Sequence, residues 1–149
     1  MSSIQLLNIA IKRDDLNDIK QLLKSHVNIN KQNDYGYTPL HFAIWSKSSL
    51  EIVQLLLTHN ADPNIQNSNG NTPLHNAITR KSSLAIIELL LNHKADINIQ
   101  DYGGRTPLDL AINEGNYEFV EFLHSYNKKR FLLPCIGIKL QSPYMGDNV

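Results

Sequence analysis

Six histidines are the residues of this sequence best suited to chemistry, because a neutral imidazole can bind zinc or transfer protons near neutral pH. His41 and His75 lie 34 positions apart, and His59 and His93 have the same separation. This regular spacing indicates one histidine of each kind in successive structural units. Packed helices lie roughly 10 Å apart, so two such histidines would be too distant to share one zinc ion. The zinc motifs C-x2-C and H-E-x-x-H are also absent from the sequence.

The other reactive side chains form no catalytic pattern. Cys135 lies in no recognisable motif, and we predict a buried, inert thiol. Glu114, Glu118 and Glu121 have the spacing of helical neighbours, which is typical of a solvated face. Gly103-Gly104 lacks the Lys-Ser or Lys-Thr of a phosphate-binding loop, so a hairpin is predicted there. The sequence therefore predicts no catalytic residue, no metal site, no cofactor and no enzyme activity.

The composition indicates a globular chain without a preference for polyanions. Hydrophobic residues make up 42% of the 149 residues, which suits one domain with its own core. The 14 basic residues equal the 14 acidic ones, which argues against a nucleic-acid-binding or membrane-binding protein. One cysteine excludes a disulfide framework and suits a reducing compartment. With no secretory signal and no apolar run of about 20 residues, we expect a location in the cytoplasm or the cytosol of a host.

An internal sequence repeat of 34 positions indicates the helices and turns that position these residues. The phrase Gly-x-Thr-Pro-Leu-His/Asp occurs at 36–41, 70–75 and 104–109. The first two copies are followed by apolar runs and then by the phrase Ala-Asp-x-Asn, at 61–64 and 95–98. A fainter copy, which ends in Asn28-Ile29-Asn30, precedes them. Such a period is typical of a solenoid whose stacked units share one core.

Each unit contains the signals for two short helices. Threonine caps a helix N-terminus and proline suits the first helical position, so each Thr-Pro begins a helix; the pairs are Thr38-Pro39, Thr72-Pro73 and Thr106-Pro107. Ser48-Ser49-Leu50-Glu51 has the pattern of a capping box and predicts a second helix from near Ser48. The glycines of the first phrase stand where a hairpin needs a positive φ.

These phrases closely resemble the ankyrin repeat, whose unit is a β-turn followed by two antiparallel helices and which carries the phrase Thr-Pro-Leu-His. The resemblance covers about residues 4–127. It implies an all-α fold, an ankyrin-repeat solenoid of stacked helix-turn-helix units with β-hairpin-like turns. We place four repeats at about 2–33, 34–67, 68–101 and 102–127, in a domain of residues 1–127. A basic and apolar C-terminal tail, 128–149, follows.

The loops depart from the family pattern. The interval of 34 is one longer than the family's usual 33, and the extra residue falls between the helices, at 46–49 and 80–83. The family's helix-ending glycine is replaced by His26, Asn60 and Lys94, of which asparagine tolerates the left-handed conformation best. We expect a modest loss of stability there.

The end units carry polar residues where the inner units are apolar. Asp18 and Gln21 stand in the first unit at positions that are isoleucine and leucine in the next two, and His124 replaces a leucine in the last. A solenoid needs polar outer faces at its ends, so we expect these units to be caps.

The resemblance implies a binding surface, because ankyrin domains bind through a concave face made of hairpin tips and first helices. Position by position, this gives eight partner-binding residues: Tyr35, Tyr37, Trp45, Asn69, Asn71, Arg80, Tyr102 and Arg105. Tyrosine, tryptophan and arginine dominate interface energetics, so their gathering on one side favours a binding face. A structural role stays open for each residue alone: a hairpin tyrosine can pack on its neighbour, and Trp45 can cover the lengthened loop.

The tail admits three interpretations. Lys128-Lys129-Arg130 is predicted to end the last helix, where positive charge suits the helix dipole. The apolar stretch 131–138 then either folds back over the exposed end of the stack or docks a second partner. A third interpretation is an F-box-like segment, as in some viral and bacterial ankyrin proteins. Leu133-Pro134 resembles its start faintly, but the residues that follow are too few for that helical module.

These observations predict a scaffold or adaptor, a monomer that binds a protein partner and neither nucleic acid nor membrane. The alternative is a regulatory or inhibitory subunit that blocks a partner enzyme with its tail. Abundant asparagine, isoleucine and lysine suit an ankyrin protein of a virus or an obligate intracellular bacterium that acts on host proteins. In a eukaryotic cytosol, 90–98 resembles the ankyrin consensus for asparagine hydroxylation, with Asn98 as the acceptor.

Overall fold

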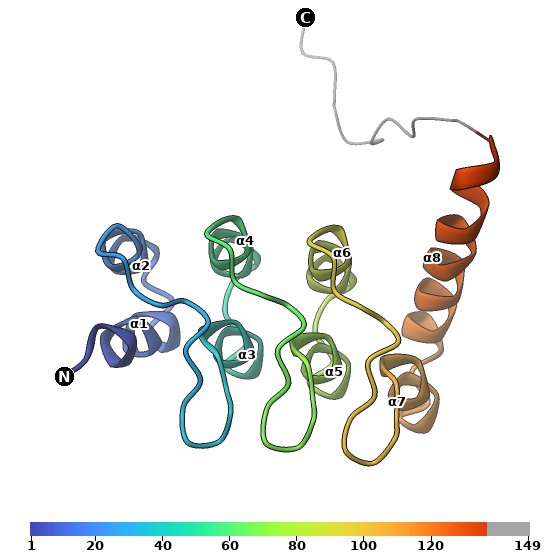
Figure 1. Ribbon diagram of the computed structural model, residues 1–149, viewed down its shortest axis with the longest axis horizontal. Helices are drawn as coiled ribbons and strands as arrows, with labels where there is room; N and C mark the ends of the chain where they lie inside the picture. The colour runs from blue at the N-terminus through green and yellow to red at the C-terminus, as the bar shows by residue number, and fades with distance from the viewer. Residues whose placement is uncertain (137–149) are drawn as a thin grey trace, which may run out of the picture.

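Four antiparallel helix pairs stack side by side in the computed structural model, which describes residues 1–136, with the backbone alone for 129–136. The first helices of the pairs are α1 (Ser3–Lys12), α3 (Pro39–Trp45), α5 (Pro73–Thr79) and α7 (Pro107–Asn113). The second helices are α2 (Leu16–Leu23), α4 (Leu50–Thr58), α6 (Leu84–Asn92) and α8 (Tyr117–Ile136). Figure 1 shows two layers, with hairpin loops that project from the layer of first helices. The described residues contain no strand, and the predicted all-α solenoid is confirmed.

The Thr-Pro signals begin the first helices as predicted. Thr38, Thr72 and Thr106 are the N-caps of α3, α5 and α7, and a proline follows each of them. The side chain three residues later accepts the N–H of the capping threonine, which closes a reciprocal capping box. In α3 and α5 that side chain is a histidine, and in α7 it is Asp109.

The predicted capping box at Ser48-Ser49-Leu50-Glu51 is wrong. α4 begins at Leu50, and its N-cap Ser49 makes no side-chain capping bond. The serines instead attach this unit to the preceding one, because the Ser48 hydroxyl donates to the Ile11 carbonyl (3.2 Å). The Ser49 N–H donates to the Asp14 carboxylate (2.9 Å). Long-range partners therefore replace the local cap.

The hairpin glycines have the predicted left-handed backbone. Gly36, Gly70 and Gly104 have φ of +73°, +78° and +77°. A Cβ on Gly36 would lie 2.6 Å from the backbone nitrogen of Ser68, so neighbouring hairpins can stack closely only because glycine is present. The helix-ending positions His26, Asn60 and Lys94 also have positive φ, as the replacement of glycine there predicted.

One core runs through the whole stack. Leu7, Leu40 and Leu74 are equivalent residues of the first helices that are buried in it, and Ile19, Val53 and Ile87 are equivalent buried residues of the second helices. Asp18, Gln21 and His124 are exposed, as expected for polar outer faces at the two ends of the stack. Stability therefore comes from contacts between neighbouring units as well as within them.

The last helix is longer than predicted. Lys128-Lys129-Arg130 does not end it, because α8 continues to Ile136 and extends past the layer of second helices (Figure 1). No glycine or proline stands at 128–133 to stop it. Cys135 lies in the last turn, where the backbone alone is described, so its buried thiol stays a prediction. The predicted fold-back concerns 131–138, of which 131–136 belong to α8 and the rest lies outside the described residues.

Candidate partner-binding face

The hairpin tips are built by one polar side chain per loop. Asn33 Oδ1 accepts the backbone N–H groups of Tyr35 (3.0 Å) and Tyr37 (2.9 Å). Asn67 and Asp101 do the same in the next two loops. Sequence reasoning missed these three residues, although their 34-residue spacing, three positions before each glycine, was a usable signal. They fix the backbone that presents the candidate binding residues.

Consecutive hairpins are tied to one another by backbone hydrogen bonds. The Ser68 N–H donates to the Tyr35 carbonyl, and the Tyr102 N–H donates to the Asn69 carbonyl, both at 3.1 Å. Gln32 and Gln66 add side-chain bonds to the carbonyls of Gln66 and Gln100 in the following loop. The tips therefore form one preformed surface.

The two histidines of the repeated phrase are structural links between units. His41 Nε2 donates to the Asn71 carbonyl (3.0 Å), and its Nδ1 accepts the Thr38 hydroxyl (2.8 Å). The bond that Nδ1 accepts needs a neutral imidazole, and burial lowers the pKa of His41 from 6.5 to about 4. His75 makes the same pair of bonds, to Arg105 and Thr72, and burial lowers its pKa as well.

Metal chemistry has no support within the described residues. No group of three or more His, Cys, Asp or Glu side chains could hold a metal ion there. His59 and His93 each place Nδ1 against the backbone carbonyl four residues earlier. Asp109, which replaces the histidine of the phrase in the last unit, is bound by the Thr106 hydroxyl and N–H, and these bonds lower its pKa.

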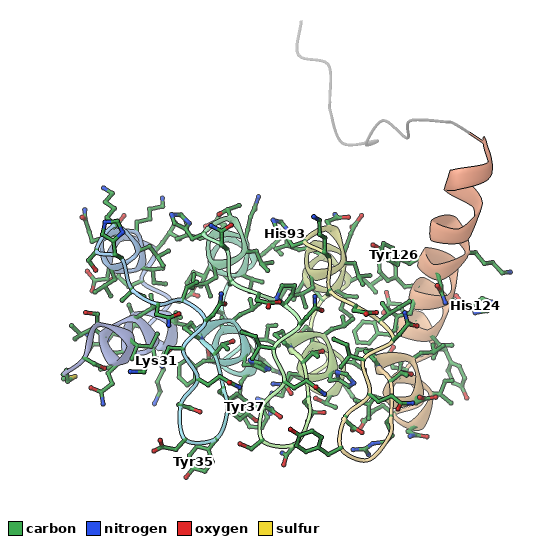
Figure 2. All side chains as sticks on the ribbon, in the orientation of Figure 1. Lys31, Tyr35, Tyr37, His93, His124 and Tyr126 are labelled. Atoms are coloured by element: carbon green, nitrogen blue, oxygen red, sulfur yellow. The ribbon has the colours of Figure 1, made fainter. Side chains whose placement is uncertain are left out.

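The aromatic candidates fall into two groups. Tyr35 and Tyr102 are exposed at hairpin tips, with 73% and 75% of their surface in solvent, and the Tyr102 ring lies beside Gly70 of the preceding hairpin. Figure 2 shows Tyr35 at the tip of its loop and Tyr37 closer to the helices. The Tyr37 ring lies edge-on to His41 (5.6 Å between centroids) and to Trp45 (6.2 Å). Tyr37 therefore has the packing role that stayed open for each tyrosine, whereas the two tip tyrosines are accessible.

Trp45 and Arg80 meet across two units. The Arg80 guanidinium carbon lies 4.2 Å from the centroid of the Trp45 ring, a distance that allows a cation–π interaction. An Arg80 terminal nitrogen also donates to the Trp45 carbonyl (3.2 Å). Trp45 is still 46% exposed, so the pair covers the end of α3 and keeps an accessible ring.

The remaining three candidates make bonds within and between the hairpins. Asn71 is half-buried, and its carbonyl accepts the His41 bond. Asn69 is exposed, and its backbone carbonyl accepts the Tyr102 N–H. Arg105 pairs with Asp101 at 2.7 Å, so its charge is neutralised inside the hairpin. The structure thus brings Tyr37, Trp45 and Arg80 into one cluster and leaves the other candidates along the tips.

Asn98 differs from its counterparts in the two preceding units. Asn30 and Asn64 each donate to a carbonyl in the following unit and accept an N–H from it. Asn98 is exposed, and within residues 1–128 its amide donates to Asp96 of its own loop alone (3.1 Å). Its side chain is therefore the accessible one of the three.

Stacked helix pairs, linked hairpins and buried histidine bridges define a repeat protein of the solenoid class. A family model described as ankyrin repeats (3 copies) matches residues 3–67 and 46–131, which together span most of the sequence. The chain belongs to the ankyrin-repeat family, whose repeats are in general protein–protein interaction modules and typically non-catalytic. A comparison with curated proteins found no match. Among the described helices, none combines the length and the apolar character that crossing a bilayer requires.

Proposed function

We propose that this chain is a non-catalytic scaffold or adaptor that binds a protein partner through its concave face, the hairpin tips and first helices. The observation that carries the proposal is the exposure of Tyr35, Tyr102 and Trp45 on these elements. Large aromatic side chains that stay in water cost solubility unless a partner covers them, and they are frequent hot spots of interfaces. Hydrogen bonds between the tips hold the face in place, which lowers the ordering cost of binding.

The test is a pull-down from cytosolic extract with the wild type and with the triple variant Tyr35→Ala/Trp45→Ala/Arg80→Ala. Tyr117→Ala is the matched control, because Tyr117 is equally exposed (79%) but begins α8, outside the face. Circular dichroism checks that each variant is folded. A partner held by the wild type and the control, and lost by the folded triple variant, supports the face. A partner held equally by all three contradicts it.

A second candidate is a regulatory or inhibitory subunit that blocks a partner enzyme with the tail 128–149. The length of α8 favours it, because this helix has 20 residues whereas α4 and α6 have 9 each. Deleting 131–149 removes the apolar part of the tail, including the last residues of α8, and separates the two candidates. Binding that survives this deletion supports the concave face, and binding that disappears supports the tail.

We further propose a monomer in a reducing cytosol, with no nucleic-acid ligand, and Asn98 as a hydroxylation site where a eukaryotic cell provides the enzyme. The exposure of Asn98 supports the last point, because its amide bonds within its own loop, whereas those of Asn30 and Asn64 are held by bonds to the next unit. Mass spectrometry of protein from such a cell would show one added oxygen on the peptide that contains Asn98. An unmodified Asn98 in protein from that source would contradict it.

A further inference from the structure

The lengthened loops of the two inner units carry the same residues and the same backbone strain. Lys47-Ser48-Ser49 recurs as Lys81-Ser82-Ser83. Both lysines are exposed and left-handed, with φ of +57° and +53°. The last unit has Gly115 at this position, with φ of +63°, where glycine adopts the conformation freely. Lysine adopts it at a cost in stability, and such strain is frequent at functional sites.

Arg80, directly before Lys81, is a fixed and unpaired positive charge. Its guanidinium is held by the ring and the carbonyl of Trp45. Within residues 1–128 the ion pair between Arg105 and Asp101 is the only one, so no carboxylate there neutralises Arg80. A guanidinium that is already held in place loses little freedom when it binds a carboxylate.

Two buried N–H donors, one of them in the Arg80 guanidinium itself, have no acceptor in the described part of the chain. They are Arg80 Nε and Asn76 Nδ2. Asn76 is 3% exposed and lies four residues before Arg80, so both side chains leave the same side of α5. The neighbouring units have Phe42 and Leu110 at the position of Asn76. Buried donors without acceptors are unfavourable, and a turn of these two side chains toward an oxygen of a bound ligand would remove that penalty.

The two inner loops themselves, 45–50 and 79–84, contain three basic residues and no acidic one. The Asp14 carboxylate accepts the Ser49 N–H, and the Asp15 carboxylate caps α2. Glu51 and Glu114 are exposed, and neither forms an ion pair within residues 1–128. Charge complementarity at the inner units therefore favours an acidic ligand.

We propose that Arg80 is the carboxylate-binding residue of this face, so that the bound segment of the partner protein is acidic. One Asp or Glu of the partner pairs with Arg80 above the Trp45 ring, and flanking acidic residues face Lys47 and Lys81. Arginine is suited to this role because its planar fork donates two parallel hydrogen bonds to one carboxylate. This inference rests on the proposed function, and it adds the chemistry of the partner.

The experiment is the panning of a random dodecapeptide phage library on the immobilised full chain, with counter-selection on the Trp45→Ala variant. Enriched peptides should share an Asp or Glu. Fluorescence polarisation with one such peptide should show a Kd about 10- to 100-fold higher for Arg80→Gln, because a charge-assisted hydrogen bond is lost. Arg80→Lys should lie between the two. Lys20→Gln is the matched control, since it removes an exposed charge from α2, and its Kd should stay within about twofold of the wild type.

A second variant keeps the test independent of folding defects. Asn76→Leu introduces the residue of the last unit, so it should leave thermal stability equal or higher and still weaken the peptide several-fold. Peptides that depend on Trp45 but lack acidic residues, or whose Kd is unchanged by Arg80→Gln, would overturn the inference. Either result would leave the proposed function standing. An absence of any Trp45-dependent peptide would count against both. Equal or tighter binding of a labelled oligothymidylate would mark a nucleic-acid site and overturn the acidic-peptide assignment.

Discussion

The inner and the terminal units of the stack share the same two-helix architecture, but different hydrogen bonds stabilise it. In the first unit Asp15 caps α2 through two backbone N–H groups, and in the last Asn116 Oδ1 accepts the Phe119 N–H. The inner second helices have Ser49 and Ser83 as N-caps, without side-chain capping bonds. The inner units instead have histidines that bond to the next hairpin, whereas the last unit has Asp109, which bonds within its own turn.

The comparison shows that the inner units have hydrogen bonds to the neighbouring unit where the terminal units have hydrogen bonds within the unit. An inner unit always has a next hairpin whose carbonyl needs a donor, so a histidine with two ring nitrogens is useful there. Within the described residues no further hairpin packs against the last unit, and a carboxylate that bonds within its own turn is sufficient there. Substitutions at equivalent positions should therefore cost more stability in inner than in terminal units.

The largest contrast is expected for glycine. Gly70→Ala places a Cβ 2.6 Å from Tyr102 Cδ1 at a φ of +78°, so we expect a loss of about 3 to 5 kcal/mol from strain and overpacking. Gly104→Ala has nothing within 4 Å at a φ of +77°, and should lose only about 1 to 2 kcal/mol. Urea unfolding measures both. Equal losses would break the comparison.

Acidification should weaken the inner units first. Folding lowers the pKa of His41 from 6.5 to about 4, so the unfolded chain takes up the proton earlier, and stability falls as the pH drops from 6.5 towards 4. The expected loss is about 3 kcal/mol for this group. The pKa values of Asp101 and Asp109 are lowered from 3.8, so their contribution is lost only below that pH. Urea titrations at pH 7, 5 and 4 should show this slope, and a His41→Gln chain with the same slope would contradict it.

The asparagine bridges give a smaller contrast. Asn64 accepts the Asp96 N–H (2.7 Å) and donates to the Lys94 carbonyl (3.0 Å), so Asn64→Ala should cost about 2 kcal/mol. Asn98→Ala removes an exposed amide that reaches no other unit, and should change stability by less than about 0.5 kcal/mol. Thermal unfolding of the two variants is the measurement. A larger loss for Asn98→Ala would reverse the expected order.

The smallest stability effect concerns the left-handed position in the loop between the two helices. A substitution there should raise stability in an inner unit and lower it in the last unit. Lys81→Gly relieves a left-handed lysine and should raise stability by up to about 1 kcal/mol. Gly115→Ala introduces the same strain with nothing within 4 Å, and should lower stability by about 1 kcal/mol. Calorimetry that finds both changes destabilising would show that the lysine is not strained.

Features set by neighbouring residues could be predicted from the sequence, and features set by distant ones could not. Thr38-Pro39 and Gly36 encode their own conformation, and both predictions were confirmed. Ser48 and Ser49 looked like a cap because their partners, Ile11 and Asp14, lie more than 30 positions earlier. The extent of α8 was missed because a basic cluster suits a helix end without requiring one.

The positions of the candidate binding residues could be predicted from the sequence, but their contacts could not. The 34-residue repeat placed the eight candidates on hairpins and first helices, which is where they lie. The stacking of Arg80 on Trp45 joins residues 35 positions apart and depends on how two units pack. The ion pair between Arg105 and Asp101 could have been predicted from the sequence, since the two residues are four positions apart in one loop.

Photo-crosslinking in cytosolic extract tests the proposed binding face most directly. A benzophenone amino acid is placed in turn at Tyr35, Tyr102 and Tyr117, three tyrosines of nearly equal exposure. We predict one adduct of the same mass from positions 35 and 102, and none from position 117. An adduct from position 117 alone would show that the partner binds elsewhere, and the concave face would have to be abandoned as the site.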